Sequence, residues 1–155
     1  MKFLNITLFN SLMIFLLTVS LFALSAPSFT QDYKVKKVGK AFSHPWGISV
    51  FDNDEVLITE RGGHLFKVNI ENGSTIKISN LPEVFNVRQG GLLDVLVDRE
   101  SVSERNVYIC YSSKVAGGSS TTLMAGTLKE DKLISKKILF KSNNVSESGV
   151  HFGCR

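Results

Sequence analysis

The stretch Val87-Arg88-Gln89-Gly90-Gly91-Leu92-Leu93-Asp94-Val95-Leu96-Val97-Asp98 places a glycine pair between a polar approach and an apolar run. The apolar run, residues 92–97, is short and partly β-branched, which is typical of a strand buried on both faces. The glycines let the backbone pass close to a neighbour where this strand begins, and that neighbour is either a ligand or another strand. The residues alone favour another strand, because glycines commonly mark the ends of strands.

Composition and charge are those of an ordinary globular chain with one domain. The 155 residues are 43% hydrophobic and 21% charged, with a net charge of +4, which is not the balance of a disordered protein. The lysines are scattered from residue 34 to residue 141 and form no stripe interleaved with aromatic residues. We therefore expect no nucleic-acid partner.

The beginning of the chain predicts export. Residues 3–31 carry no charge, and the apolar stretch at 12–24 has the length of a signal-peptide core but is short for a membrane-spanning helix. Small residues at Ala23 and Ser25 predict that residues 1–25 are a signal peptide, cleaved before Ala26. An uncleaved anchor is the alternative. After cleavage the mature part, residues 26–155, would be periplasmic or secreted, with no stable membrane insertion.

Both cysteines, Cys110 and Cys154, fall in the exported part. An oxidising compartment permits a disulfide between them. However, Cys110 lies in a strand-like run and Cys154 in a polar motif, and the sequence gives no distance between the two. Two free, partly buried thiols are therefore the expectation.

Short alternating segments between turn signals predict an all-β fold. A strand-like segment at 32–40 comes first, and strands at 55–60, 64–70 and 75–79 follow around tight turns. A second group of strands is predicted at 92–97, 106–111, 121–128 and 133–140. Two groups of about four strands, repeating after roughly 50 residues, match the blades of a β-propeller, and a sandwich is the alternative. Because the smallest propellers need about four blades, the chain is expected to be the N-terminal piece of a longer protein.

His151 is the candidate catalytic residue. A neutral imidazole can accept a proton near neutral pH, and Gly149 and Gly153 would allow a substrate to approach it. Taken alone, a histidine in a Ser/Gly loop is more often a solvent-exposed residue without function. The three histidines form no HxH or HExxH pattern and Cys110 has no CxxC partner, so no metal site is predicted within the chain.

Five motifs stand in the order found in the soluble, pyrroloquinoline-quinone-dependent glucose and aldose sugar dehydrogenases. They are PWGI at residues 45–48, LITERGGHL at 57–65, RQGGLLDV at 88–95, NVYICYS at 106–112 and HFGCR at 151–155. The chain resembles the exported bacterial branch of this family from about Val38 to its last residue. The resemblance implies a six-bladed β-propeller that carries pyrroloquinoline quinone (PQQ) over its central channel and is activated by calcium. It also implies oxidation of an aldose at its anomeric carbon to a lactone.

The same resemblance assigns roles to individual residues. It makes His151 the catalytic base that takes the proton of the anomeric hydroxyl, and Gln89 the cofactor-binding glutamine that faces both cofactor and substrate. The resemblance thereby favours a ligand, and not another strand, as the neighbour of the glycine pair after Gln89. Val150 stands where some members carry an aspartate, and Cys154 replaces a small hydroxyl residue. The partners implied are a small-molecule sugar and an external electron acceptor.

The resemblance also bears on how much of the enzyme is present. In family members the basic residues that hold the quinone and the groups that ligate calcium lie further along the chain. These 155 residues are therefore expected to form only the first two or so blades and to be inactive alone. The alternatives are a non-catalytic propeller used for binding or scaffolding and a lactone hydrolase. The hydrolase would need a cluster of metal-binding carboxylates, whereas Asp94 and Asp98 are interpreted as a strand-end cap and a turn residue.

Overall fold

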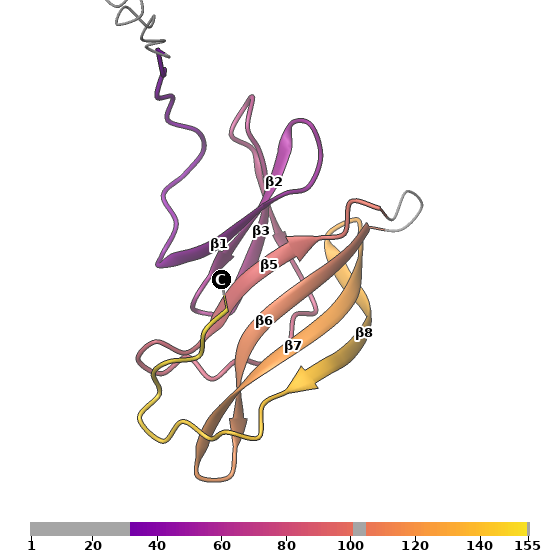
Figure 1. Cartoon of the computed structure of the whole chain (residues 1–155). Helices are drawn as coiled ribbons and strands as arrows, with labels where there is room; N and C mark the ends of the chain where they lie inside the picture. The colour runs from indigo at the N-terminus through magenta and orange to yellow at the C-terminus, as the bar shows by residue number, and fades with distance from the viewer. Residues whose placement is uncertain (1–31, 101–104, 155) are drawn as a thin grey trace, which may run out of the picture. The chain divides into compact units, whose positions relative to one another are not determined.

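The computed structural model describes residues 32–100 and 105–154, and in this part of the chain every regular element is a strand (Figure 1). The predicted signal peptide and Arg155 lie outside the described residues. Within the described ranges no helix is long and apolar enough to cross a membrane. The strands belong to one compact unit that begins at Lys37.

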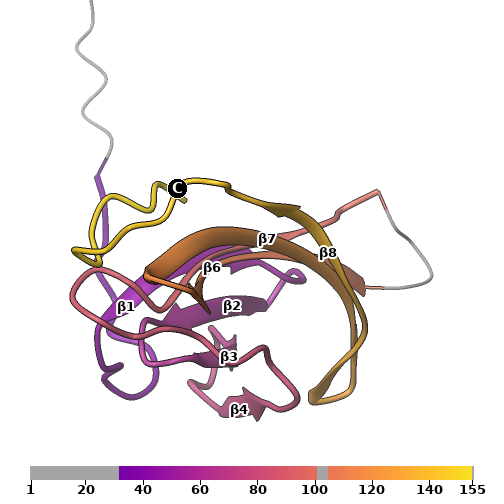
Figure 2. The ribbon, with the colours of Figure 1, turned by 90° about the horizontal axis from the view of Figure 1, so that it is seen from below.

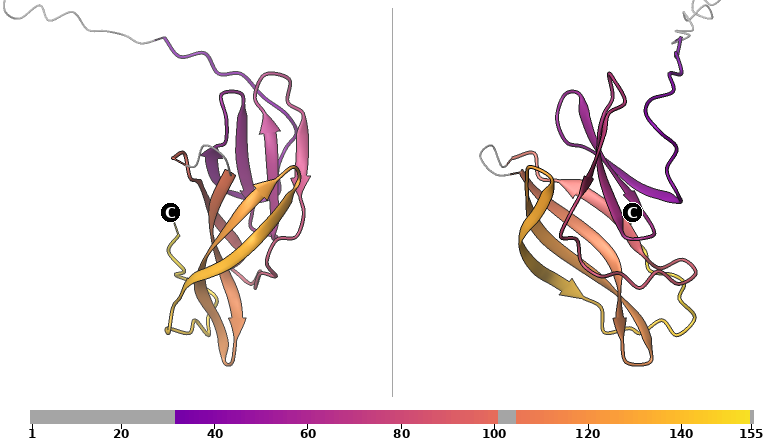
Figure 3. Two further views of the ribbon diagram at one scale, coloured as in Figure 1. Left: turned by 90° about the vertical axis from the view of Figure 1, so that its right-hand side faces the viewer. Right: turned by 180° about the vertical axis from the view of Figure 1, so that it is seen from behind.

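Eight strands form two antiparallel sheets of four, and each sheet is a meander in sequence order. The first sheet contains β1 (Pro45–Val50), β2 (Glu55–Glu60), β3 (His64–Asn69) and β4 (Thr75–Ile78). The second contains β5 (Leu92–Val97), β6 (Arg105–Val115), β7 (Gly118–Lys129) and β8 (Lys132–Lys141). Figures 2 and 3 show the second sheet lying across one face of the first as a separate layer. The predicted all-β architecture of two four-stranded meanders is confirmed.

The hydrophobic core lies between the two sheets. Residues that alternate along each strand point inward, as period-two patterning requires. The fully buried members include Leu57 and Leu65 from the first sheet, and Leu92, Val107 and Ile109 from the second. The hydroxyl of Thr59, also fully buried, donates to the carbonyl oxygen of Leu93 and joins the layers by a hydrogen bond.

Most strand bounds agree with the sequence, but β6 and β7 extend further toward their shared hairpin than expected, and the first strand is misplaced. The segment 32–40, which was predicted to be strand-like, contains no strand, and the position beside β2 is taken by β1. Pro45 opens β1 at the edge of the sheet, where a missing backbone donor is tolerated. Residues just before β1 instead cover the outer side of the sheet, where Lys40 Nζ lies 4.3 Å from the centre of the Phe66 ring.

The outer faces of both sheets also carry apolar side chains. Leu96, Tyr108, Cys110, Leu123 and Phe140 share the outer face of the second sheet by register, and Leu96 is 60% exposed. On the first sheet Ile48 is 62% exposed. In a two-sheet sandwich the outward positions are polar. Apolar side chains on both faces favour a propeller, in which each blade packs between two neighbours.

Candidate functional site

Two loops that are far apart in sequence meet at one place in the compact unit. The backbone N–H of Gln89 donates to the carbonyl oxygen of Gly149 at 3.0 Å. The backbone N–H of His151 donates to Oε1 of Gln89, also at 3.0 Å, across a separation of 62 residues. Both side chains are exposed to solvent. The structure therefore brings together the two residues expected to share a site, while their roles remain predictions.

The loop that carries Gln89 is fixed from below by Ser112 of β6. The Ser112 hydroxyl donates to the carbonyl oxygen of Phe85 at 2.8 Å and accepts the backbone N–H of Gly91 at 2.7 Å. The Ser112 backbone adds a hydrogen bond to each of the same two residues, at 2.8 and 2.9 Å. Residues 85–91 are therefore held as an arch over a fully buried serine.

Gly91 is needed because another strand end approaches it closely. A Cβ atom at Gly91 would overlap the carbonyl oxygen of Arg61, which accepts the backbone N–H of Leu92 at 3.0 Å. The close neighbour of Gly91 is thus Arg61, the turn residue directly after β2 of the first sheet. The approach also aligns the ends of β2 and β5 beside the Gln89 loop.

The segment that carries His151, residues 142–154, lies on the outer face of the second sheet (Figures 2 and 3). It has little regular structure of its own, and His151 takes a left-handed backbone conformation with φ of 64°. The Ser146 hydroxyl accepts the backbone N–H of Val150 at 3.1 Å and donates to the Val150 carbonyl oxygen at 2.9 Å. Hydrogen bonds to the sheet and to the Gln89 loop therefore determine where His151 sits.

A groove of about 760 Å³ lies beside His151. Its lining is rich in hydroxyl and amide side chains, including Ser119, Ser142 and Asn144, with the exposed ring of Phe140 on one side. Such groups can exchange hydrogen bonds with a polar ligand. Gln89 touches the backbone of His151 but does not line the groove.

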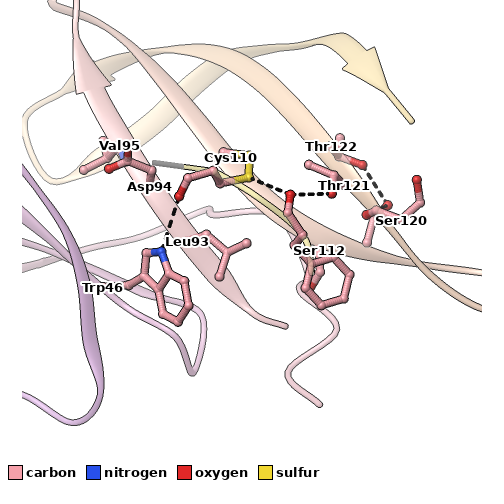
Figure 4. The surroundings of a disulfide bond; sticks show 12 residues. Trp46, Leu93, Asp94, Val95, Cys110, Ser112, Ser120, Thr121 and Thr122 are labelled. Atoms are coloured by element: carbon pink, nitrogen blue, oxygen red, sulfur yellow. Dashed lines mark hydrogen bonds between the residues drawn. A yellow bond between two sulfur atoms is a disulfide. The ribbon is translucent and has the colours of Figure 1, made fainter. Parts of the chain in front are cut away.

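Cys110 and Cys154 form a disulfide, with their Cα atoms 5.9 Å apart (Figure 4). The expectation of two free thiols is therefore wrong. The sequence offers no distance between a strand residue and a loop residue 44 positions later. In the structure, the register of β6 turns the Cys110 side chain to the outer face of the second sheet. The loop that carries Cys154 passes over this face, so the two cysteines come close enough to bond.

Two acid–base groups among the described residues have shifted pKa values. Burial raises the pKa of Glu60, but the Ser43 backbone N–H at 2.6 Å, the His64 imidazole at 3.0 Å and the charge of Lys40 outweigh burial and leave that pKa below its ordinary value. Burial raises the pKa of Tyr111 above its ordinary value. Glu60 is thus a buried carboxylate held ionised immediately before Arg61.

The described residues offer groups that can hydrogen-bond a polar ligand, but no side-chain cluster for calcium. Gln89 and His151 supply an amide and an imidazole, and the Nε atom of Arg61 is a buried donor with no hydrogen-bond partner among the described residues. No group of three or more His, Cys, Asp or Glu side chains in ranges 32–100 and 105–154 could hold a metal ion. Asp94 lies inside β5 and caps no strand end, whereas Asp98 accepts a turn N–H from Glu100, as interpreted.

The family model described as glucose/sorbosone dehydrogenase matches residues 42–155. The aldose sugar dehydrogenase YliI of Escherichia coli is 33% identical over 116 residues, which are 72% of this chain and 31% of that protein. The soluble aldose sugar dehydrogenase of Escherichia coli, solved in its apo form, superposes with a TM-score of 0.67 at 32% identity and covers 73% of this chain and 34% of its own.

A more distant solved structure shares the fold. The PQQ-bound aldose sugar dehydrogenase of Streptomyces coelicolor has a TM-score of 0.59 at 19% identity, covering 70% of this chain and 33% of its own. The chain thus spans about a third of the length of the relatives that it matches. With a family match over most of the described residues and two sheets arranged as successive blades, the chain belongs to the glucose/sorbosone dehydrogenase family of β-propeller proteins.

Proposed function

We propose that this chain is the amino-terminal part of an exported, PQQ-dependent oxidoreductase that oxidises the anomeric carbon of aldose sugars to lactones. The observation that carries the proposal is the hydrogen bond between the backbone of His151 and the side chain of Gln89. It joins the two loops that the family resemblance assigns to catalysis. The relatives named as aldose sugar dehydrogenases support the sugar substrate, and the PQQ-bound relative supports the cofactor.

The proposed roles follow from the chemistry of these side chains. His151, exposed beside the groove, takes the proton of the anomeric hydroxyl as general base. Gln89 holds the His151 backbone through Oε1, and the family resemblance assigns the rest of its amide to contacts with cofactor and substrate. When bound, the quinone supplies the two-electron acceptor for the hydride that leaves the anomeric carbon. An external acceptor would then reoxidise the enzyme, and calcium would be held by groups beyond the described residues.

Replacement of His151 tests the proposal in the longer protein that contains this chain. His151→Ala should lower kcat by about 100- to 10,000-fold, the usual contribution of a general base. His64→Ala is the matched control, because that imidazole contacts Glu60 and Phe66 and does not line the groove. Sugar-dependent dye reduction with added PQQ and calcium measures both. An unchanged rate in His151→Ala would remove His151 from the mechanism, and no turnover in the unmodified protein would favour a binding or scaffold role.

The 155 residues alone are proposed to be inactive, because two blades leave apolar outer faces uncovered and offer no side-chain calcium cluster among the described residues. Sugar-dependent dye reduction by the 155-residue chain would contradict this. Export is proposed through residues 1–25, and a mature protein recovered outside the cytoplasm should begin at Ala26 on N-terminal sequencing.

A further inference from the structure

The His151 segment crosses the second sheet with few backbone hydrogen bonds of its own. Ser119 and Ser146 exchange two of them, at 3.2 and 2.7 Å, near the beginning of the segment. Further along, the Thr121 hydroxyl donates to the carbonyl oxygen of Phe152 at 2.9 Å. The segment is therefore attached at both ends of the short stretch that includes His151.

The backbone around His151 is one that a free chain rarely adopts. Gly149, His151, Gly153 and Cys154 all have positive φ angles, between 61° and 70°. For residues other than glycine this left-handed conformation costs about 1–3 kcal/mol when the surroundings do not impose it. Tertiary contacts must therefore hold His151 and Cys154 in place.

The disulfide is the covalent contact of this kind. Cys110 lies in the middle of β6, paired with Leu123 of β7, and Cys154 follows His151 by three residues. Figure 4 shows Trp46 beneath the bridge, and its indole N–H donates to the carbonyl oxygen of Cys154 at 3.4 Å. The bridge and this hydrogen bond tie the segment after His151 to both sheets, whereas the Gln89 side chain holds the backbone of His151 itself.

We propose that the Cys110–Cys154 disulfide is a positioning element for His151, so that catalysis by this histidine depends on the oxidised bridge. The structural part of the inference, that the bridge holds the segment on the sheet, rests on the fold alone. The kinetic part, that turnover depends on the bridge, rests on the proposed function. A base must stay within hydrogen-bond reach of the proton that it removes. Misplacement by about 1 Å can cost on the order of 100-fold in rate.

The structural part is tested by hydrogen exchange on the longer protein that contains this chain. Dithiothreitol reduces the bridge by two electrons and two protons, giving two thiols and oxidised dithiothreitol. We expect amide exchange in peptides covering residues 145–154 to become at least about tenfold faster, while the β2–β3 hairpin is unchanged. The Cys110→Ala/Cys154→Ala double variant should show the same fast exchange without reductant, and reductant should not change it further.

The kinetic part tests whether this movement reaches the base. Reduction or the double substitution should lower kcat by about 10- to 100-fold, because the base moves away from the proton that it removes, and KM should rise as well, because residues 144–148 and 150–153 also line the groove. Slow exchange after reduction, or an unchanged kcat, would overturn the proposal. If the unmodified protein oxidises no sugar, the proposed function fails, and the exchange experiment still decides whether the bridge positions the segment.

A second readout covers the case in which the double variant does not fold. Trp46 is the single tryptophan of the 155 residues, and its indole contacts Cys154. Reduction of the 155-residue chain, in which emission reports on Trp46 alone, should shift that emission as the segment leaves the sheet. Emission that does not change on complete reduction, verified by thiol counting, would contradict release of the segment.

Discussion

Ser112 shows how one buried hydroxyl can hold a functional loop. Its hydroxyl donates to the Phe85 carbonyl oxygen and accepts the Gly91 N–H. Both groups belong to residues 85–91, the arch that carries Gln89. Ser112→Ala should lower the free energy of unfolding by about 1–3 kcal/mol, because it leaves the buried Gly91 N–H without its hydrogen bond and removes one of the two that the Phe85 carbonyl oxygen accepts, the other coming from the Val87 N–H. Urea denaturation measures the loss.

The neighbouring serine provides the control for Ser112. Ser113 is half-buried, and its hydroxyl bonds the Thr122 hydroxyl at 2.8 Å. This partner is a hydroxyl that can rotate and not a fixed backbone N–H, so Ser113→Ala should cost less than Ser112→Ala. Equal losses for the two variants would show that the arch does not depend on Ser112.

Glu60 links stability to acid pH. Its pKa is lowered in the folded protein, so ionised Glu60 contributes stability that is fully present above the unfolded-state pKa, about 4.3. This contribution is lost as the pH falls through the lower folded-state pKa. Glu60→Gln should therefore be less stable than the wild type at pH 6, and the difference should shrink as the pH falls below about 4. Urea unfolding at several pH values measures it, and a difference independent of pH would contradict the assignment.

At the scale of residues, the sequence points to candidate site residues but not to the contacts that support them. His151 and Gln89 are predicted through glycine-flanked motifs and a family resemblance, and the structure joins them by a hydrogen bond. The sequence does not predict the supporting role of Ser112, because a serine in a strand looks like any other polar residue of the alternating pattern. The Cys110–Cys154 bridge is missed for a related reason: pairing depends on which face of β6 bears Cys110 and on the path of residues 142–154.

The close approach of β2 and β5 leads to a test at the scale of elements. At Gly91 a Cβ atom would overlap the Arg61 carbonyl oxygen, and the residue has φ of 141°. Gly91→Ala therefore requires the backbone to move and should lower the free energy of unfolding by about 3 kcal/mol or more. Gly117 also has positive φ, 81°, but a Cβ atom added there would meet no other atom within 4 Å.

Gly117→Ala therefore isolates the backbone cost, which is about 1 kcal/mol. Thermal or urea unfolding of the two variants, with the wild type alongside, separates the close approach from the backbone preference. Similar losses would mean that the ends of β2 and β5 can separate freely.

Strand positions were predictable where side chains alternate between turn residues. The strands β2, β4 and β5 begin and end within one residue of the expected positions. The first strand was misplaced because residues 32–40 alternate like a strand, while β1 opens with proline and contains a buried glycine, which weaken the strand pattern. Only the pairing of β1 with β2 decides between the two segments.

At the scale of the whole compact unit, the described residues form two blades. The apolar side chains on their inner faces are buried against each other, whereas many on their outer faces are exposed to solvent. The core between the sheets is closed, whereas Leu96 and Phe140 on the second sheet are 60% and 57% exposed. The His151 segment covers only part of that outer face. Apolar groups left in water favour association, so the 155-residue chain should self-associate at micromolar concentration.

Removing these two apolar groups should abolish self-association without unfolding the blades. Leu96→Lys with Phe140→Lys should shift the 155-residue chain to a monomer in sedimentation velocity. The free energy of unfolding should change by less than about 0.5 kcal/mol per site, because both side chains are already mostly in water. Ser135→Lys with Asn143→Lys adds the same charge at exposed polar positions and should leave self-association intact. If both double variants become monomeric, charge and not the apolar outer face controls assembly, and the argument that this face is built to pack on another blade fails.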